Sequence, residues 1–105
     1  MSTCCVVRFI DRGRPLCAFY KHYDGGDFEQ TLAKFLADYE MVSGLPMTVT
    51  GKIANGMPDL AAQVIANFKD GPGDIYMCAT DDEGDYTYEV RDDDETPVVT
   101  TVSQP

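Results

Sequence analysis

The sequence predicts an α+β domain in which one antiparallel sheet of four to five strands carries two helices on a single face, in the order ββααβββ. Apolar residues alternate with polar ones near both ends of the chain, which is typical of strands. Between these regions, two segments repeat apolar residues at three- and four-residue steps, which is typical of amphipathic helices. The length of 105 residues, with 44% hydrophobic and 25% charged residues, indicates one globular domain spanning 1–105.

The first two predicted strands form a hairpin. Thr3 to Asp11 is rich in Val, Ile, Phe and Cys, and Leu16 to Tyr23 alternates in polarity. The intervening segment, Arg12 to Pro15, contains the Gly and Pro that are typical of a turn. The alternation places on one side of the second strand Leu16, Ala18, Tyr20 and His22.

The first predicted helix follows Asp24-Gly25-Gly26, with Asp27 as the residue whose carboxylate caps its N-terminus. The helix is expected to end between Met41 and Ser43, because Gly44 follows. Its apolar face consists of Phe28, Leu32, Phe35, Leu36 and Tyr39.

The second predicted helix is preceded by a long loop, from Leu45 to Met57, and is expected to begin at Pro58-Asp59. The segment Gly71-Pro72-Gly73 ends it. Its apolar face consists of Leu60, Val64, Ile65 and Phe68.

Three further strands are predicted, over Asp74 to Thr80, Tyr86 to Arg91 and Pro97 to Val102. The last is expected at an edge of the sheet, since Pro97 lacks an N–H group. With both helices on one face, the other face is left to solvent or to a partner. The polar and aromatic residues that we expect on that open face are Tyr20, His22, Tyr86 and Tyr88.

Acidic residues dominate the charge of the chain, with 18 Asp and Glu against 8 Lys and Arg and a net charge of −10. Half of the acids lie between residues 81 and 95. This density disfavours direct binding to DNA or to an anionic membrane. It favours a partner with a basic surface, because carboxylates can occupy a basic groove in place of phosphates. The alternative is an acidic run that only improves solubility. The predicted partner-binding residues are Asp81, Asp82, Glu83, Asp85, Asp92, Asp93, Asp94 and Glu95.

A nucleotide site is the alternative to the acidic run. Basic residues gather on the first hairpin, and two Gly-containing turns precede helices, whose free N–H groups suit an anion. Tyrosines could stack on a base, but the chain has no phosphate-binding loop motif. The residues of this alternative site are Arg8, Arg12, Arg14, Tyr20, His22, Asp24, Gly25, Asn55 and Gly56.

Catalysis, metals and cofactors are not expected. His22 is the only histidine, and it lies five residues from Cys17 in one strand, so the two side chains face opposite sides. Cys4 and Cys5 are too close in sequence to chelate zinc, and we predict that both, with Cys17 and Cys78, are reduced thiols. The chain lacks a secretory signal and a long apolar run, which predicts the cytoplasm.

Several short motifs together resemble a family of small uncharacterised proteins from tailed phages and from mobile regions of bacterial and archaeal genomes. The resemblance covers about residues 6–90. It implies a counter-defence role in the cytoplasm of a host cell. Gly26-Asp27 stand where the family tends to have an aromatic residue and a proline, which implies a different ligand if that loop binds one. The motifs are Tyr20 to Gly25, Gly51 to Met57 with Leu60 to Gln63, Ile75-Tyr76 and Tyr86 to Tyr88.

These observations favour a phage-type accessory protein that inhibits a host defence function by binding a basic, nucleic-acid-handling protein, such as a CRISPR-type nuclease complex. Two alternatives remain open, a protein that sequesters a small nucleotide signal and a structural or assembly protein. Self-association is left open as well.

Overall fold

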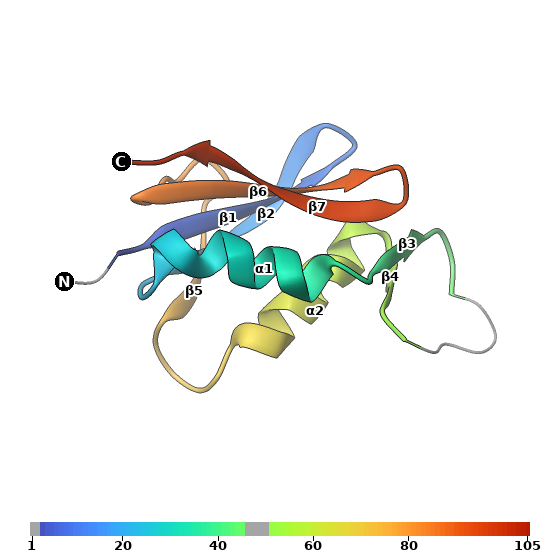
Figure 1. Ribbon diagram of the computed structural model, residues 1–105, viewed down its shortest axis with the longest axis horizontal. Helices are drawn as coiled ribbons and strands as arrows, with labels where there is room; N and C mark the ends of the chain where they lie inside the picture. The colour runs from blue at the N-terminus through green and yellow to red at the C-terminus, as the bar shows by residue number, and fades with distance from the viewer. Residues whose placement is uncertain (1–2, 46–50) are drawn as a thin grey trace.

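The computed structural model describes residues 3–45 and 51–105, and shows a five-stranded sheet with two helices on one face (Figure 1). The strands lie in the order β5-β2-β1-β6-β7, and a separate small sheet pairs β3 with β4. The helices are α1 (Phe28–Leu36) and α2 (Gly56–Phe68), and a 3₁₀ turn, η1 (Gly25–Asp27), precedes α1. The strands are β1 (Cys5–Asp11), β2 (Arg14–Lys21), β3 (Glu40–Val42), β4 (Ile53–Asn55), β5 (Ile75–Cys78), β6 (Tyr86–Asp93) and β7 (Thr96–Ser103).

The α+β class, the five strands and the two helices are therefore confirmed, but the expectation of a purely antiparallel sheet is wrong. β1 pairs with β6 in parallel, while β1–β2, β2–β5 and β6–β7 are antiparallel. The element order is ββαββαβββ, not ββααβββ, because β3 and β4 form within the region between the helices. Alternation of polarity marks a strand but does not identify its neighbours in the sheet.

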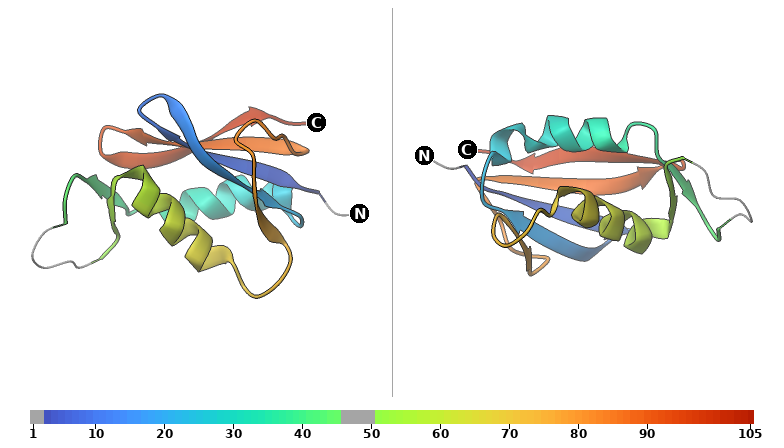
Figure 2. Two further views of the ribbon diagram at one scale, coloured as in Figure 1. Left: turned by 180° about the vertical axis from the view of Figure 1, so that it is seen from behind. Right: turned by 90° about the horizontal axis from the view of Figure 1, so that it is seen from below.

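The connection between β5 and β6, Ala79 to Asp85, crosses the face opposite the helices, which we call the open face (Figure 2). Arg8 in the middle of β1 donates from Nη2 to the carbonyl of Asp82 at 3.1 Å. At Gly84, an added Cβ would lie only 2.9 Å from the Cα of Cys5. The crossing segment therefore packs directly on β1.

Helix boundaries also differ from the predictions. α1 ends at Leu36, well before Met41, and the chain then turns into β3. The carboxylate of Asp27 makes no capping hydrogen bond within the described residues. Of the predicted loop Leu45 to Met57, residues 46–50 lie outside the described residues, and its later part forms β4 and the start of α2.

The core lies between the sheet and the helices. Phe19 of β2 is fully buried there, and Tyr20 lies on the opposite side, so the predicted alternation of this strand is confirmed. Tyr88 is only 1% exposed, and its hydroxyl donates to the carbonyl of Gly25 at 2.6 Å. Tyr86 stacks on Tyr88 with ring centroids 6.0 Å apart. The expectation that Tyr86 and Tyr88 lie on the open face is therefore wrong, because periodicity groups residues by face without saying which face is covered.

An ion pair joins the end of β2 to the start of β5. Lys21 Nζ donates to Asp74 Oδ2 at 2.6 Å, and the backbone N–H of Tyr23 donates to Oδ1 at 3.0 Å. Burial alone would raise the pKa of Asp74, but the hydrogen bonds from Lys21 and Tyr23, with the charge of Lys21, hold the pKa below its usual value.

No helix among the described residues is long and apolar enough to cross a membrane.

Gly25→Ala should destabilise the fold. An added Cβ would lie 2.4 Å from the backbone carbon of Cys4, and backbone cannot move aside as a side chain can. We expect a loss of about 1–3 kcal/mol in the free energy of unfolding, measured in urea. Gly26→Ala is the matched control, because its Cβ would meet only the Tyr86 ring, at 3.1 Å. Equal losses in the two variants would contradict this account of Gly25.

Asp74→Asn should flatten the dependence of stability on pH. Because the folded pKa of Asp74 lies below its ordinary value of 3.8, the ionised carboxylate stabilises the fold above that pH. This stabilisation is lost as the pH falls through the lower, folded value. The free energy of unfolding, measured between about pH 6 and pH 2, should fall more steeply in the parent than in Asp74→Asn. Asp70→Asn, at an exposed position, should retain the parental profile.

Candidate functional site

All eight predicted partner-binding acids are exposed, and they form two separate groups. Asp81, Asp82, Glu83 and Asp85, which we call the loop acids, lie in the crossing segment. Asp92 to Glu95, the turn acids, lie at the other end of β6. Because a strand rises about 3.3 Å per residue, the eight residues of β6 hold the two groups roughly 25 Å apart.

Two of the loop acids hold the conformation of the crossing segment. Asp82 Oδ2 accepts from the backbone N–H of Ala79 at 3.1 Å, and Asp85 Oδ2 accepts from the backbone N–H of Cys4 at 3.2 Å. For Asp81 and Glu83 the described residues provide no such hydrogen bond. Asp81 and Glu83 are therefore the loop acids whose carboxylates are available to a partner.

The turn acids occupy a tight hairpin that carries backbone strain. Asp94 and Glu95 have φ values of 53° and 68°, in the left-handed region that favours Asn-Gly in such turns. The N–H of Met41 donates to the carbonyl of Glu95 at 2.9 Å and anchors the turn. Two acidic side chains at these positions cost folding free energy, on the order of 1 kcal/mol each, which favours a role for them outside folding.

Tyr20, His22, Tyr23 and Tyr76 form an aromatic patch at the end of β2 and on β5. The hydroxyl of Tyr20 lies 3.1 Å from His22 Nδ1, and its ring centroid lies 6.4 Å from that of Tyr76. The rings of His22 and Tyr23 are 4.5 Å apart. Tyr23 and Tyr76 are each 54% exposed.

The aromatic patch and the loop acids meet at Cys4. Burial raises the pKa of Tyr20, and a hydrogen bond with the Cys4 thiol and the charge of Asp85 raise it further. Cys4 Sγ in turn donates to Asp85 Oδ2 at 3.5 Å. Tyrosine faces bordered by carboxylates suit the side chains of Arg and Lys, through cation–π contacts and ion pairs. Tyr23 and Tyr76 were not among the predicted site residues. Tyr76 comes beside Tyr20 only through the pairing of β2 with β5, and Tyr23 lies beyond the last residue of β2.

The residues of the alternative nucleotide site do not come together. Arg8 lies on the open face, 3.7 Å from Glu89, and its buried Nε has no hydrogen-bond partner among the described residues. Arg12 and Arg14 flank the β1–β2 turn, at the end of the sheet where Asn55 and Gly56 also lie. The remaining residues of the alternative nucleotide site lie at the opposite end of β1, near Thr3. They are Tyr20, His22, Asp24 and Gly25.

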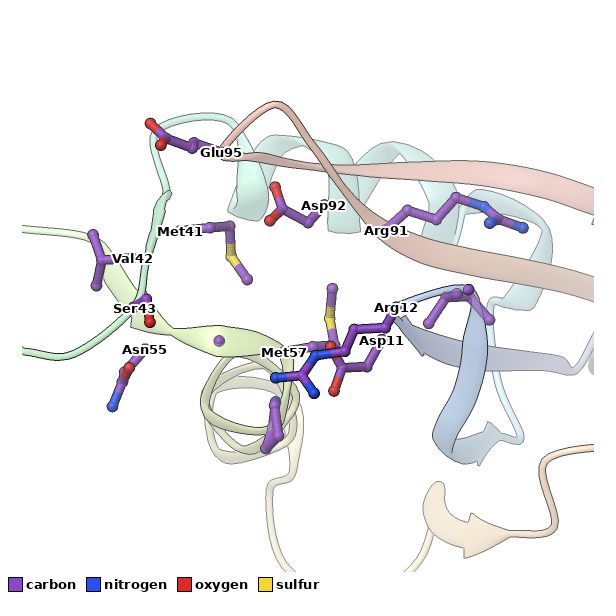
Figure 3. A pocket seen from close by; sticks show the side chains of 14 residues that line it. Asp11, Arg12, Met41, Val42, Ser43, Asn55, Met57, Arg91, Asp92 and Glu95 are labelled. Atoms are coloured by element: carbon purple, nitrogen blue, oxygen red, sulfur yellow. The ribbon is translucent and has the colours of Figure 1, made fainter.

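A cleft of about 760 Å³ opens beside the β1–β2 turn, between β3, the start of α2 and the end of β6 (Figure 3). Two arginines line it, Arg12 and Arg91. Three carboxylates line it as well, which leaves an excess of negative charge and disfavours a phosphate group. These are Asp11, Asp92 and Glu95.

All four cysteines lie in the described residues, and none is paired in a disulfide there. Cys4, Cys5, Cys17 and Cys78 are all free, and burial raises the pKa of Cys5 to about 12. Within residues 3–45 and 51–105, no three His, Cys, Asp or Glu side chains are grouped so that they could hold a metal ion.

Removing the carboxylates of Asp82 and Asp85 should destabilise the fold, whereas removing those of Asp81 and Glu83 should not. The first pair accepts backbone hydrogen bonds, worth about 0.5–1.5 kcal/mol each. The double variant Asp82→Ala, Asp85→Ala should therefore melt below the parent. Asp81→Ala with Glu83→Ala, which removes the same charge, should melt at or slightly above it, because like-charge repulsion falls. Equal melting temperatures in the two double variants would contradict the division.

Comparison of the chain with protein-family models, with curated proteins and with solved structures finds no match. The chemistry of the site itself is therefore the basis for a function.

Proposed function

We propose that this chain is a binding protein, and that the loop acids and the aromatic patch together engage a basic surface of a partner protein. The observation that carries this proposal is the crossing of the open face by Ala79 to Asp85, which holds four exposed carboxylates on that face and brings one of them, Asp85, through Cys4 to Tyr20 of the aromatic patch. The turn acids, at the other end of β6 from the loop acids, provide a second contact.

The two kinds of side chain have different tasks in this proposal. Asp81 and Glu83 attract a basic partner over a distance and accelerate association, as exposed interfacial charges do. Tyr23 and Tyr76 supply the area that is buried on contact, and tyrosine is among the residues that most often dominate binding energy at interfaces. The structural hydrogen bonds of Asp82 and Asp85 keep the loop in its conformation before the partner arrives.

A protein partner is favoured over a small nucleotide. The residues of the nucleotide site are divided between the two ends of the sheet, and the cleft near Arg12 contains more carboxylates than guanidinium groups. The net charge of −10 also opposes the approach of an anion.

We further propose that the partner handles nucleic acid, and that binding inhibits it. Carboxylates at both ends of β6 can take the place of phosphates in a basic groove. The resemblance to phage accessory proteins makes a host defence nuclease complex the first partner to test.

The test compares three variants that each remove two negative charges, with a partner captured from lysate of defence-bearing cells by the tagged parent. They are Asp81→Asn with Glu83→Gln, Asp92→Asn with Asp93→Asn, and the control Asp38→Asn with Asp70→Asn. At low salt the loop variant should associate several-fold more slowly than the parent, and the control should match the parent. The difference should shrink at high salt, because exposed charges are screened.

Equal association rates in all three variants would refute the role of the acidic residues. Tyr76→Ala should act differently, by raising the dissociation rate with little change in association. A short DNA duplex should compete with the chain for the captured partner if both occupy one groove. Simultaneous binding of both would exclude mimicry of nucleic acid while leaving the protein contact intact.

A further inference from the structure

The outer edge of β7 is long and uncharged. β7 is the last strand in the sheet order and spans eight residues, all of them Thr, Pro, Val or Ser. Such an edge presents unpaired backbone groups, and most proteins protect it with charges, a bulge or a covering element. In β7 the register against β6 shifts opposite Thr87 and Tyr88 and leaves Val102 as an extra residue, so the regular part of the edge runs from Thr96 to Thr101. In a chain with a net charge of −10, a charge-free edge of this length is unusual.

Pro97 fixes which backbone groups point outward. Pro97 pairs with Asp92 and has no N–H to donate, so it occupies a position whose backbone points away from β6. Val99 and Thr101, which lie two and four residues further along β7, have the same backbone orientation as Pro97. No hydrogen bond to the backbone of either residue from outside the sheet is present within the described parts of the chain.

The opposite edge is protected. β5 has only four residues, and Lys69 Nζ donates to the carbonyl of Ile75 at 2.8 Å. A short strand and a covering lysine are two of the ways in which proteins prevent pairing at an edge. The two edges of the same sheet are therefore treated differently, and only β7 is left able to pair.

We infer that β7 pairs in an antiparallel arrangement with β7 of a second copy of this chain, about a two-fold axis near Thr100. The two sheets then form one continuous sheet with all helices on the same face. A second copy is favoured over a basic partner strand because β7 offers no charge that would attract one. Because β7 itself has no charged residue, the pairing of the two strands places no like charges of β7 opposite each other.

The antiparallel arrangement also separates the acidic turns. Each turn lies at the start of β7, so in the dimer the two turns sit at opposite ends of the new strand pair. Eight residues of strand span about 26 Å, which exceeds the screening length of about 8 Å at physiological salt. A parallel arrangement would place the turn acids of both copies side by side.

α1 lies over β7 (Figure 2), and the hydroxyl of Thr101 hydrogen-bonds to Glu29 of this helix. Pairing at β7 therefore brings the α1 helices of the two copies alongside each other. The crossing segment lies on the opposite face of the sheet, so the loop acids stay exposed in the dimer. This inference is independent of the proposed function.

The experiment measures the mass in solution by sedimentation equilibrium at about 0.1 mM protein and about 0.15 M salt. The parent should have twice the 11.6 kDa mass of one chain. Thr100→Lys places two lysines near the axis and should yield the monomer. Met77→Lys, which adds the same charge at the exposed β5 edge, is the matched control and should remain dimeric.

Circular dichroism shows whether the Thr100→Lys variant is folded, and amide exchange supplies a second readout. The N–H groups of Val99 and Thr101 should exchange slowly in the parent and at least tenfold faster in a folded Thr100→Lys monomer. A monomeric parent under these conditions overturns the inference. So does a dimer that Met77→Lys dissociates and Thr100→Lys does not.

Discussion

The parallel pairing of β1 with β6 is the constraint on which the rest of this structure depends. β5 runs antiparallel to β2, as β1 does, so β5 and β6 point the same way. Two parallel strands cannot be joined by a tight turn, and the chain must therefore cross the sheet between them. Here β5 adds to the far edge, beyond β2, and Ala79 to Asp85 returns across the open face. The crossing covers the centre of that face, where Val6 and Thr87 are almost completely buried. β1 is therefore buried on both sides, which is why its sequence is a nearly continuous apolar run.

The same constraint accounts for the one charged side chain within that run. Arg8 points to the open face, where it donates to the carbonyl of Asp82 and forms an ion pair with Glu89, which also contacts Arg91. Removing one partner of such a half-buried pair leaves a charge uncompensated. Arg8 thus links the central strand to the crossing segment and to β6. Its position explains why a residue that suggests an anion site in the sequence serves packing in the structure.

Local patterns in the sequence predicted most of the elements but not their arrangement. Phe19 and Tyr20 fall on opposite sides of β2 as expected, and the hairpin turn at Gly13 was evident from composition. The position of β6 between β1 and β7 was not predictable, since it depends on contacts between residues some eighty positions apart. The error at Tyr88 has the same origin. The exposed acids were predictable from charge density. Only part of the aromatic patch was, because alternation placed Tyr20 and His22 on one side of β2, whereas Tyr76 joins them only through strand pairing.

The arrangement separates the surfaces that can act. The helices cover one face, the crossing segment and the aromatic patch occupy the other, and β7 forms an edge of the sheet that β1 and β6 separate from β2, the strand of Tyr20. The proposed pairing at β7 would use backbone groups in the plane of the sheet, so it would leave the loop acids on the open face exposed. Two copies joined at β7 would present two acidic loops on one face of a continuous sheet, at a fixed spacing. A partner with repeated basic sites would then be held at two points, and the second contact would form at a high effective concentration. If the proposed partner is held in this way, two modest contacts, each made by a few carboxylates and tyrosines, would together bind it more strongly than either contact alone.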